Sequence, residues 1–159
     1  MARTAKEPKD LWQDVVLPPV PPRSEVKIHE LEDEIKQFGL STQYPVIADA
    51  KGEKFWAARE ELTPEKFIQY WDNPKEAEIA WKIIHMAKDH FDRPQLRMFY
   101  PNDPMFIYAA WHNDSLDDVE YIIVLEQEFN TKIPDEVFAK FLCTFTIQEA
   151  VQYLIVHAK

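Results

Sequence analysis

The sequence holds a single cysteine, Cys143, and no hydrophobic run that approaches the roughly 20 apolar residues of a membrane-spanning helix. One thiol excludes an intrachain disulfide, and it excludes zinc sites built from several cysteines. The cysteine usage favours a reducing compartment. The absence of a long apolar run predicts a soluble chain that does not span a membrane.

Positive charge is also scarce, because 18 Lys and Arg residues stand against 28 Asp and Glu residues and give a formal net charge of -10. Such a chain is repelled by nucleic acid and by anionic membrane surfaces, so neither is an expected partner. Basic protein surfaces are the natural counterpart. The acids concentrate between residues 114 and 136, where Lys132 is the only basic residue; they are Asp114, Asp117, Asp118, Glu120, Glu126, Glu128, Asp135 and Glu136.

The composition is that of a folding chain, with 46% hydrophobic and 29% charged residues in a length of 159. This length suits one ordinary domain, or a small domain with an extension. The first ten residues mix Arg3, Lys6 and Lys9 with Glu7 and Asp10, a poor match to a secretory signal or an acid-free transit peptide. Targeting is left open by these residues.

Residues 1–23 are predicted to form an extended arm, because Leu17-Pro18-Pro19-Val20-Pro21-Pro22-Arg23 has too many prolines for a helix or a central strand. The spacing Pro18-x-x-Pro21-x-Arg23 also fits a ligand for an SH3-like groove. The plainer interpretation is a linker, or an arm laid across a neighbour.

Three further elements are expected before residue 73. Ser24 is predicted to cap a helix that ends at Gly39 and carries its apolar residues on one stripe. Residues 43–58 have apolar pairs on either side of a polar turn and predict a short hairpin. Thr63-Pro64 marks the start of another helix. The stripe of the first helix comprises Ile28, Leu31, Ile35 and Phe38.

Asn73-Pro74-Lys75-Glu76 combines an N-cap, a proline at the first helical position and a capping-box glutamate, so it predicts the start of a helix. The helix should end before Pro94. A long loop with many buried aromatic residues is expected from residue 92 to 113, a short helix over 135–141, and a last helix capped by Thr146 and Glu149. The inward stripe of the helix that follows Asn73 comprises Ala77, Ala80, Trp81, Ile84, Ala87 and Phe91.

His85 and Asp89 lie four residues apart on this helix, a spacing that places two metal-ligating side chains on one face. Two ligands without a third nearby are more often part of a solvated helix face. We therefore expect a solvated face here and no metal site.

Residues 113–135 predict one acidic amphipathic helix. Leu116, Val119, Ile122, Ile123 and Phe129 gather on one side, and acidic and amide residues gather opposite. Asp114 suits the N-cap and places Ser115 beside the positive end of the helix dipole. A phosphate ester on the Ser115 hydroxyl is favourably sited there.

The C-terminal half resembles an acyl carrier protein. The resemblance rests on Asp114-Ser115-Leu116-Asp117, Val119-Glu120, Leu125-Glu126, Glu128-Phe129, Ile133-Pro134-Asp135-Glu136 and Thr146-Ile147-Gln148-Glu149-Ala150-Val151, in the family's order and with most of its spacings. It implies an all-α protein, a four-helix bundle over residues 73–159 with an N-terminal extension over 1–72. The extension has no counterpart in the resemblance.

The resemblance implies that Ser115, between Asp114 and Leu116, carries a 4'-phosphopantetheine arm whose thiol holds an acyl chain, and that the protein is a carrier in fatty acid biosynthesis and not itself an enzyme. It implies docking of basic partners on Asp117, Asp118 and Glu120: fatty-acid synthesis enzymes, or helical proteins with a Leu-Tyr-Arg motif. The residues that line the acyl pocket by resemblance are Ile122, Leu125, Ile133, Phe138 and Ala150.

Family analogy further implies an accessory subunit of a mitochondrial respiratory complex, with a cytoplasmic carrier as the alternative location. A rival interpretation is a purely structural subunit that has the carrier fold and no prosthetic group. Hydrolysis by Ser115 is the third, but it is disfavoured because no glycine-bearing nucleophile elbow surrounds this serine, although His112 is near in sequence.

Overall fold

The computed structural model describes residues 14–40, 50–105, 107 and 115–158, and every regular element assigned among them is a helix. The all-α class is thereby confirmed for this part of the chain. An isolated antiparallel bridge joins Pro104 to Thr146. No helix within the described ranges is long and apolar enough to cross a membrane. The α-helices are α2 (Leu31–Phe38), α3 (Ala50–Ala58), α4 (Pro64–Phe67), α5 (Pro74–His90), α7 (Ser115–Phe129), α8 (Asp135–Cys143) and α9 (Ile147–His157), and two 3-10 helices cover Arg23–Glu25 and Ile68–Tyr70.

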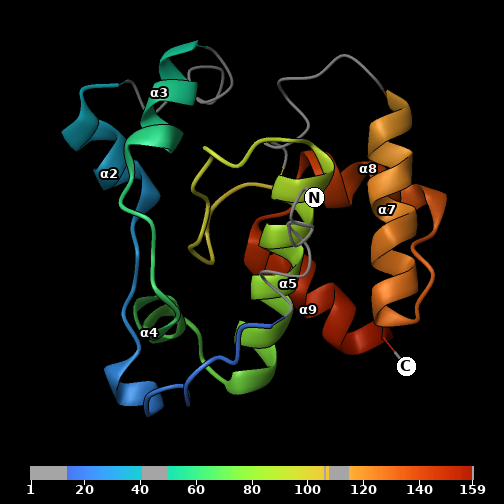
Figure 1. The fold of residues 1–159 in the computed structure, drawn as a ribbon, viewed down its shortest axis with the longest axis horizontal. Coiled ribbons are helices and arrows are strands. Elements are labelled where there is room, and N and C mark those ends of the chain that lie inside the picture. Colours follow the sequence, from blue (N-terminus) through green and yellow to red (C-terminus); the bar gives the residue numbers. More distant parts are fainter. Residues whose placement is uncertain (1–13, 41–49, 106, 108–114, 159) are drawn as a thin grey trace, which may run out of the picture.

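Helix α5 is the centre of the fold, with α7, α8 and α9 on one side and α2, α3 and α4 on the other (Figure 1). It begins where the sequence predicts, because the Asn73 side chain accepts the Glu76 backbone N–H at 2.9 Å and Pro74 occupies the first turn. The Glu76 carboxylate accepts a hydrogen bond from Gln152 of α9. The predicted stripe is buried in full, and Ile79, Ile83 and Met86 are buried as well, so α5 is enclosed on nearly all sides.

Helix α9 is the main packing partner of α5. Its predicted capping box is formed, since the Thr146 hydroxyl accepts the Glu149 N–H and the Glu149 carboxylate accepts the Thr146 N–H. Ala150, Val151 and Leu154 are fully buried along its inner side. The described loop before α7 is tied to the start of α9 by backbone hydrogen bonds, among them Ile147 N–H to Asp103 O at 2.8 Å.

Helix α7 packs on α5 through Tyr121, whose hydroxyl donates to the Ile83 carbonyl at 3.1 Å and whose ring lies against Phe91. The residues of α7 that are buried are Tyr121, Ile122, Leu125 and Phe129. The predicted apolar stripe is therefore wrong at Val119 and Ile123, which are 42% and 44% exposed. The anchor at Tyr121 rotates the buried side of the helix away from these two residues.

Two expectations in the N-terminal half are wrong. Ser24 caps no α-helix: it lies within the 3-10 helix, and α2 begins only at Leu31, which leaves Ile28 exposed. Residues 26–30 are held extended, partly by the hydrogen bond from Lys27 N–H to Gln69 O at 2.7 Å. The predicted stop at Gly39 is correct, since its φ of 93° is the left-handed conformation that favours glycine.

The predicted hairpin over 43–58 is also wrong in its described part, because Ala50–Ala58 forms helix α3; residues 43–49 lie outside the described residues. Phe55 and Trp56 are adjacent and both buried. A strand would send these two side chains to opposite faces, whereas a helix keeps neighbouring residues within one broad face.

The described part of the proline-rich arm contains no α-helix, and its residues Val15, Leu17 and Val20 pack partly buried against the core. Thr63 caps α4 as predicted, and Phe67 of α4 makes an edge contact with Trp81 of α5 at 5.2 Å between ring centroids. Side chains from both sides of residue 73 thus belong to one hydrophobic core. The division into units at residues 72 and 73 stays a prediction.

Candidate functional site

The predicted attachment residue, Ser115, is the first residue of α7, a helix of 15 residues. The first turn of a helix carries backbone N–H groups without helical partners and the positive end of the dipole. Asp114 lies outside the described residues, and so do the side chains of Ser115, Leu116 and Asp117. Because Asp114 is not among the described residues, the N-cap assigned to it and the phosphate site at Ser115 stay predictions.

The acidic residues of α7 divide into two groups. Glu126 accepts the Ile133 backbone N–H at 2.8 Å, and Glu128 forms an ion pair with Lys82 of α5 at 3.4 Å, so both support the fold. Among the predicted docking residues, Glu120 is exposed and Asp118 is half-buried. The surface of α7 that a partner can reach is thus acidic at Glu120.

An open groove of about 560 Å³ runs between α7 and α8. Val119, Ile122 and Ile123 form its α7 side, and Ile133 and Phe138 lie opposite. Three residues of the predicted acyl pocket, Ile122, Ile133 and Phe138, line this groove. Glu126, Lys132 and Asp135 add charge to its lining.

The other two predicted pocket residues, Leu125 and Ala150, are fully buried in the core. Leu125 lies on the side of α7 that faces away from solvent, and Ala150 lies on the inner side of α9. The groove is therefore assembled from the solvent-facing edge of α7 and from the segment around α8.

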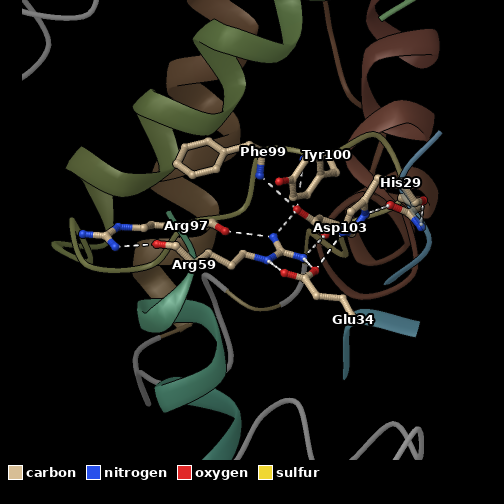
Figure 2. A network of polar contacts seen from close by, with 8 residues as sticks. His29, Glu34, Arg59, Arg97, Phe99, Tyr100 and Asp103 are labelled. Carbon is tan, nitrogen blue, oxygen red and sulfur yellow. Dashed lines mark hydrogen bonds and ion pairs between the residues drawn. The ribbon is translucent and has the colours of Figure 1, made fainter. Parts of the chain in front are cut away.

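A second constellation, which the sequence interpretation missed, is a buried polar network centred on Arg59 (Figure 2). The guanidinium forms a bidentate pair with Asp103, at 2.7 and 2.9 Å, and another with Glu34, at 2.7 and 3.0 Å. A fifth hydrogen bond, of 2.8 Å, reaches the Arg97 carbonyl. An arginine has five N–H donors, so every donor of Arg59 is used.

The network is also enclosed by aromatic rings and backbone. The Arg59 guanidinium carbon lies 4.5 Å from the Trp56 ring centre and 4.9 Å from that of Tyr100, at cation–π distance. The Asp103 carboxylate accepts the backbone N–H groups of Phe99 and Tyr100. Burial alone would lower the pKa of Arg59, but the two carboxylates outweigh it and raise the pKa, so the group stays charged.

His29 extends this network towards the surface. Its Nε2 lies 2.7 Å from Glu34 Oε1, its Nδ1 lies 3.0 Å from Asn102 Oδ1, and its ring stacks on Tyr100 at 3.7 Å. The Asn102 amide nitrogen donates to the His29 carbonyl at 2.9 Å, which fixes oxygen as the atom that faces the imidazole. Both ring nitrogens therefore meet acceptors, and only the doubly protonated imidazolium satisfies both.

The ionisation of the pair agrees with this geometry. Burial would lower the pKa of His29, but its hydrogen bonds with Glu34 and Asn102 outweigh burial and raise it. Burial would raise the pKa of Glu34, but the hydrogen bonds from His29 and Arg59 lower it. Stability from Glu34 is thus lost as the pH falls below the usual carboxylate range, and stability from His29 is lost as the pH rises.

His29→Phe is expected to flatten the pH dependence of stability at neutral and alkaline pH. The imidazolium contributes fully below its unfolded pKa, about 6.5, and its contribution disappears as the pH passes the raised folded pKa. The wild-type chain should lose on the order of 1 to 3 kcal/mol over this range, whereas the phenylalanine variant keeps the ring stacking and loses nothing there. Urea unfolding midpoints at about pH 5.5 and about pH 8.5 measure the difference. Parallel profiles for the two proteins contradict a charged His29.

Every donor of Arg59 is engaged within the protein, so the network connects parts of the fold. It joins α2, the end of α3 and the segment 97–103 by bonds between residues 25 and 44 positions apart. The sequence signal was faint: an arginine shortly after a buried aromatic pair, and an aspartate in an aromatic loop.

His85 corrects another expectation, that of a solvated face. Its ring is half-buried, stacks on Trp81 at 4.2 Å between centroids, and has its Nδ1 2.9 Å from the Trp81 carbonyl. Burial lowers the pKa of His85 to about 4, so it is neutral at physiological pH. Within the described part of the chain, no group of three or more His, Cys, Asp or Glu residues is arranged to hold a metal ion.

Comparison with known proteins found no protein-family model and no solved structure that matches this chain.

Proposed function

We propose that the protein is an acyl-carrier-like subunit that holds an acyl chain on a 4'-phosphopantetheine arm at Ser115. The observation that carries the proposal is the position of this serine as the first residue of α7, the helix that forms one side of the apolar groove. A phosphodiester at Ser115 gains from the free N–H groups and the dipole of the helix start. The arm supplies the thiol on which the acyl chain is carried.

The all-helical class of the described residues supports this proposal. In this proposal α5, α7, α8 and α9 are the four helices of the carrier bundle, and the groove between α7 and α8 receives the acyl chain. The groove is lined by aliphatic side chains that are otherwise left in contact with water, including Val119 and Ile123. Covering them with an apolar chain is favourable by about 25 cal/mol for each Å² removed from water.

The partners in this proposal are proteins with basic, helical docking surfaces. Asp117, Asp118 and Glu120 provide the acidic contact, and the net charge of -10 steers a basic partner towards the chain. Fatty-acid synthesis enzymes and helical proteins of the Leu-Tyr-Arg type are the two partner classes. The subunit role in a mitochondrial complex belongs to the same proposal, with a cytoplasmic carrier as the alternative.

The proposal assigns no catalysis to this chain, because a separate transferase attaches the arm. Intact-mass measurement of protein purified from its native cells tests the assignment. We expect an added phosphopantetheine, with or without an acyl group, that is lost completely in Ser115→Ala. Ser24→Ala is the matched control, since this serine lies in the short 3-10 helix on the far side of the fold, and it should leave the modification intact.

A second experiment guards against low occupancy in the native pool. Purified protein is incubated with coenzyme A and a phosphopantetheinyl transferase of broad specificity, and the labelled peptide is mapped. A native chain without the added mass, together with no loading at Ser115 in this assay, contradicts the carrier function.

The second candidate function is a structural subunit without a prosthetic group. The open groove favours it as well, because Val119 and Ile123 offer an apolar strip on which the side chain of a partner protein fits as readily as an acyl chain. If this candidate is correct, native protein carries no phosphopantetheine at Ser115 and still associates with its partner.

A further inference from the structure

Lys88 of α5 is an unusual lysine, because it is only 6% exposed. Its ammonium nitrogen lies 4.7 Å from the centre of the Phe99 ring, a cation–π contact. No carboxylate among the described residues lies within ion-pair distance of this nitrogen. Lysines are rarely buried unless they are paired, so an unpaired one calls for another explanation.

Lys88 also lines a cavity of about 640 Å³. None of the residues that line this cavity lines the groove between α7 and α8. Leu62, Pro64 and Trp81 give this cavity an apolar wall, and Val15 of the N-terminal arm contributes to it. The volume is in the range that holds a small organic molecule. Lys88 is thus one of the residues that line a space a ligand can enter.

His85 lines the same cavity one helical turn before Lys88. Its Nδ1 is hydrogen-bonded to the Trp81 carbonyl and therefore carries the proton, which leaves a lone pair on Nε2. A neutral imidazole with a free lone pair is a proton acceptor. Lys88 and a neutral imidazole therefore line the same space, three positions apart on α5.

The burial of Lys88 shifts its ionisation towards the free amine. Burial lowers the pKa of Lys88, and Arg97 lowers it further, while the more distant Glu61 and Asp89 offset part of this effect. A lysine with a lowered pKa has a larger fraction of free, nucleophilic amine at neutral pH.

We propose that Lys88 is a covalent binding site for an uncharged, apolar aldehyde. The amine attacks the carbonyl carbon, the nitrogen gives up protons and the former carbonyl oxygen takes two, and water leaves as the carbon–nitrogen double bond forms. His85 accepts a proton from the nitrogen after attack and returns it to the departing hydroxyl group. The products are an imine and one water molecule, so no oxidant or reductant is required.

The charge of the cavity selects among aldehydes. Glu61 and Asp89 line it, and Lys88 is the only Lys or Arg among its described lining residues. Because imine formation uses the positive charge of Lys88, no cation remains to balance an anionic ligand. Phosphorylated and carboxylated aldehydes are therefore disfavoured against neutral ones of the same shape.

Reductive trapping tests the proposal on the full chain. The protein is incubated with benzaldehyde and cyanoborohydride at about pH 7, and each lysine's share of alkylation is read by peptide mapping. We expect Lys88 to react faster than the exposed Lys75 and Lys140, because burial lowers its pKa and leaves more of its amine free. Labelling of Lys88 no faster than of these two reference lysines in the native protein overturns the proposal.

Three controls sharpen the result. In urea the preference for Lys88 should vanish, because it depends on the folded cavity. The anionic analogue 4-formylbenzoate should label Lys88 more slowly than benzaldehyde does. His85→Gln should slow labelling at Lys88 alone, with circular dichroism to verify folding; an unchanged rate removes His85 from the reaction. Failure here leaves the Ser115 proposal untouched, since the two sites share no residue.

Discussion

Replacement of Asp103 by alanine is expected to lower the free energy of unfolding by about 3 to 5 kcal/mol, which is the range for removing one member of a buried ion pair. Asp103 is fully buried, and it accepts two hydrogen bonds from Arg59 and two from the backbone N–H groups of Phe99 and Tyr100. The variant leaves a buried guanidinium with half of its carboxylate partners. Urea denaturation followed by circular dichroism measures the loss.

The matched control is Asp33→Ala, which removes an exposed carboxylate from the first turn of α2. Exposed substitutions of this kind change stability by about 0.5 kcal/mol or less. A variant in which Arg59→Met accompanies Asp103→Leu should be less damaged than Asp103→Ala, because it leaves no buried guanidinium facing position 103. If Asp103→Ala lowers the free energy of unfolding no more than Asp33→Ala does, the network does not stabilise the fold.

Phe67→Ala is the second substitution with a large expected effect, about 3 to 5 kcal/mol, as for other fully buried phenylalanines. The Phe67 ring is inaccessible to solvent and packs against Trp71 and Trp81, with centroids 5.8 and 5.2 Å away. It therefore connects the predicted extension, residues 1–72, to the central helix α5. Phe38→Ala, which removes a ring that is nearly half exposed, should cost clearly less.

The shape of the Phe67→Ala unfolding curve tests the predicted division of the chain. Because residues on both sides of position 73 share one core, tryptophan fluorescence and circular dichroism should report the same single transition. Two separate transitions, with only the first one shifted by the substitution, contradict a shared core and support residues 1–72 as an independent unit.

The features that were predictable from the sequence are those in which the interacting residues lie a few positions apart along the chain. Asn73 caps α5 through Glu76, and Thr146 caps α9 through Glu149, each over three positions. The stripe of α5 is likewise set by a local period. The left-handed stop at Gly39 belongs to this class.

The features that were not predictable depend on distant partners. Residues 26–30 are extended because Gln69 and Asn102 bind them, and α2 consequently starts later than its sequence indicates. The period of α7 gives a broad apolar side, but the contact of Tyr121 with Ile83 decides which part of that side is buried.

Dependence on distant partners also explains why the predicted pocket residues do not all lie in one place. The resemblance assigned five residues to one pocket, yet only the placement of α8 determines that Ile122, Ile133 and Phe138 border an open groove while Leu125 and Ala150 fill the interior. Arg59 is the extreme case, since its partners lie 25 and 44 positions away on either side and no short pattern links them.

The packing of α5 on α9 has a consequence for biosynthesis. On the ribosome, α5 is synthesised before its principal partner α9, with α7 and α8 between them in the chain. Until α9 is made, the apolar residues of α5 that pack on it lack this partner, a state in which nascent chains are prone to aggregate.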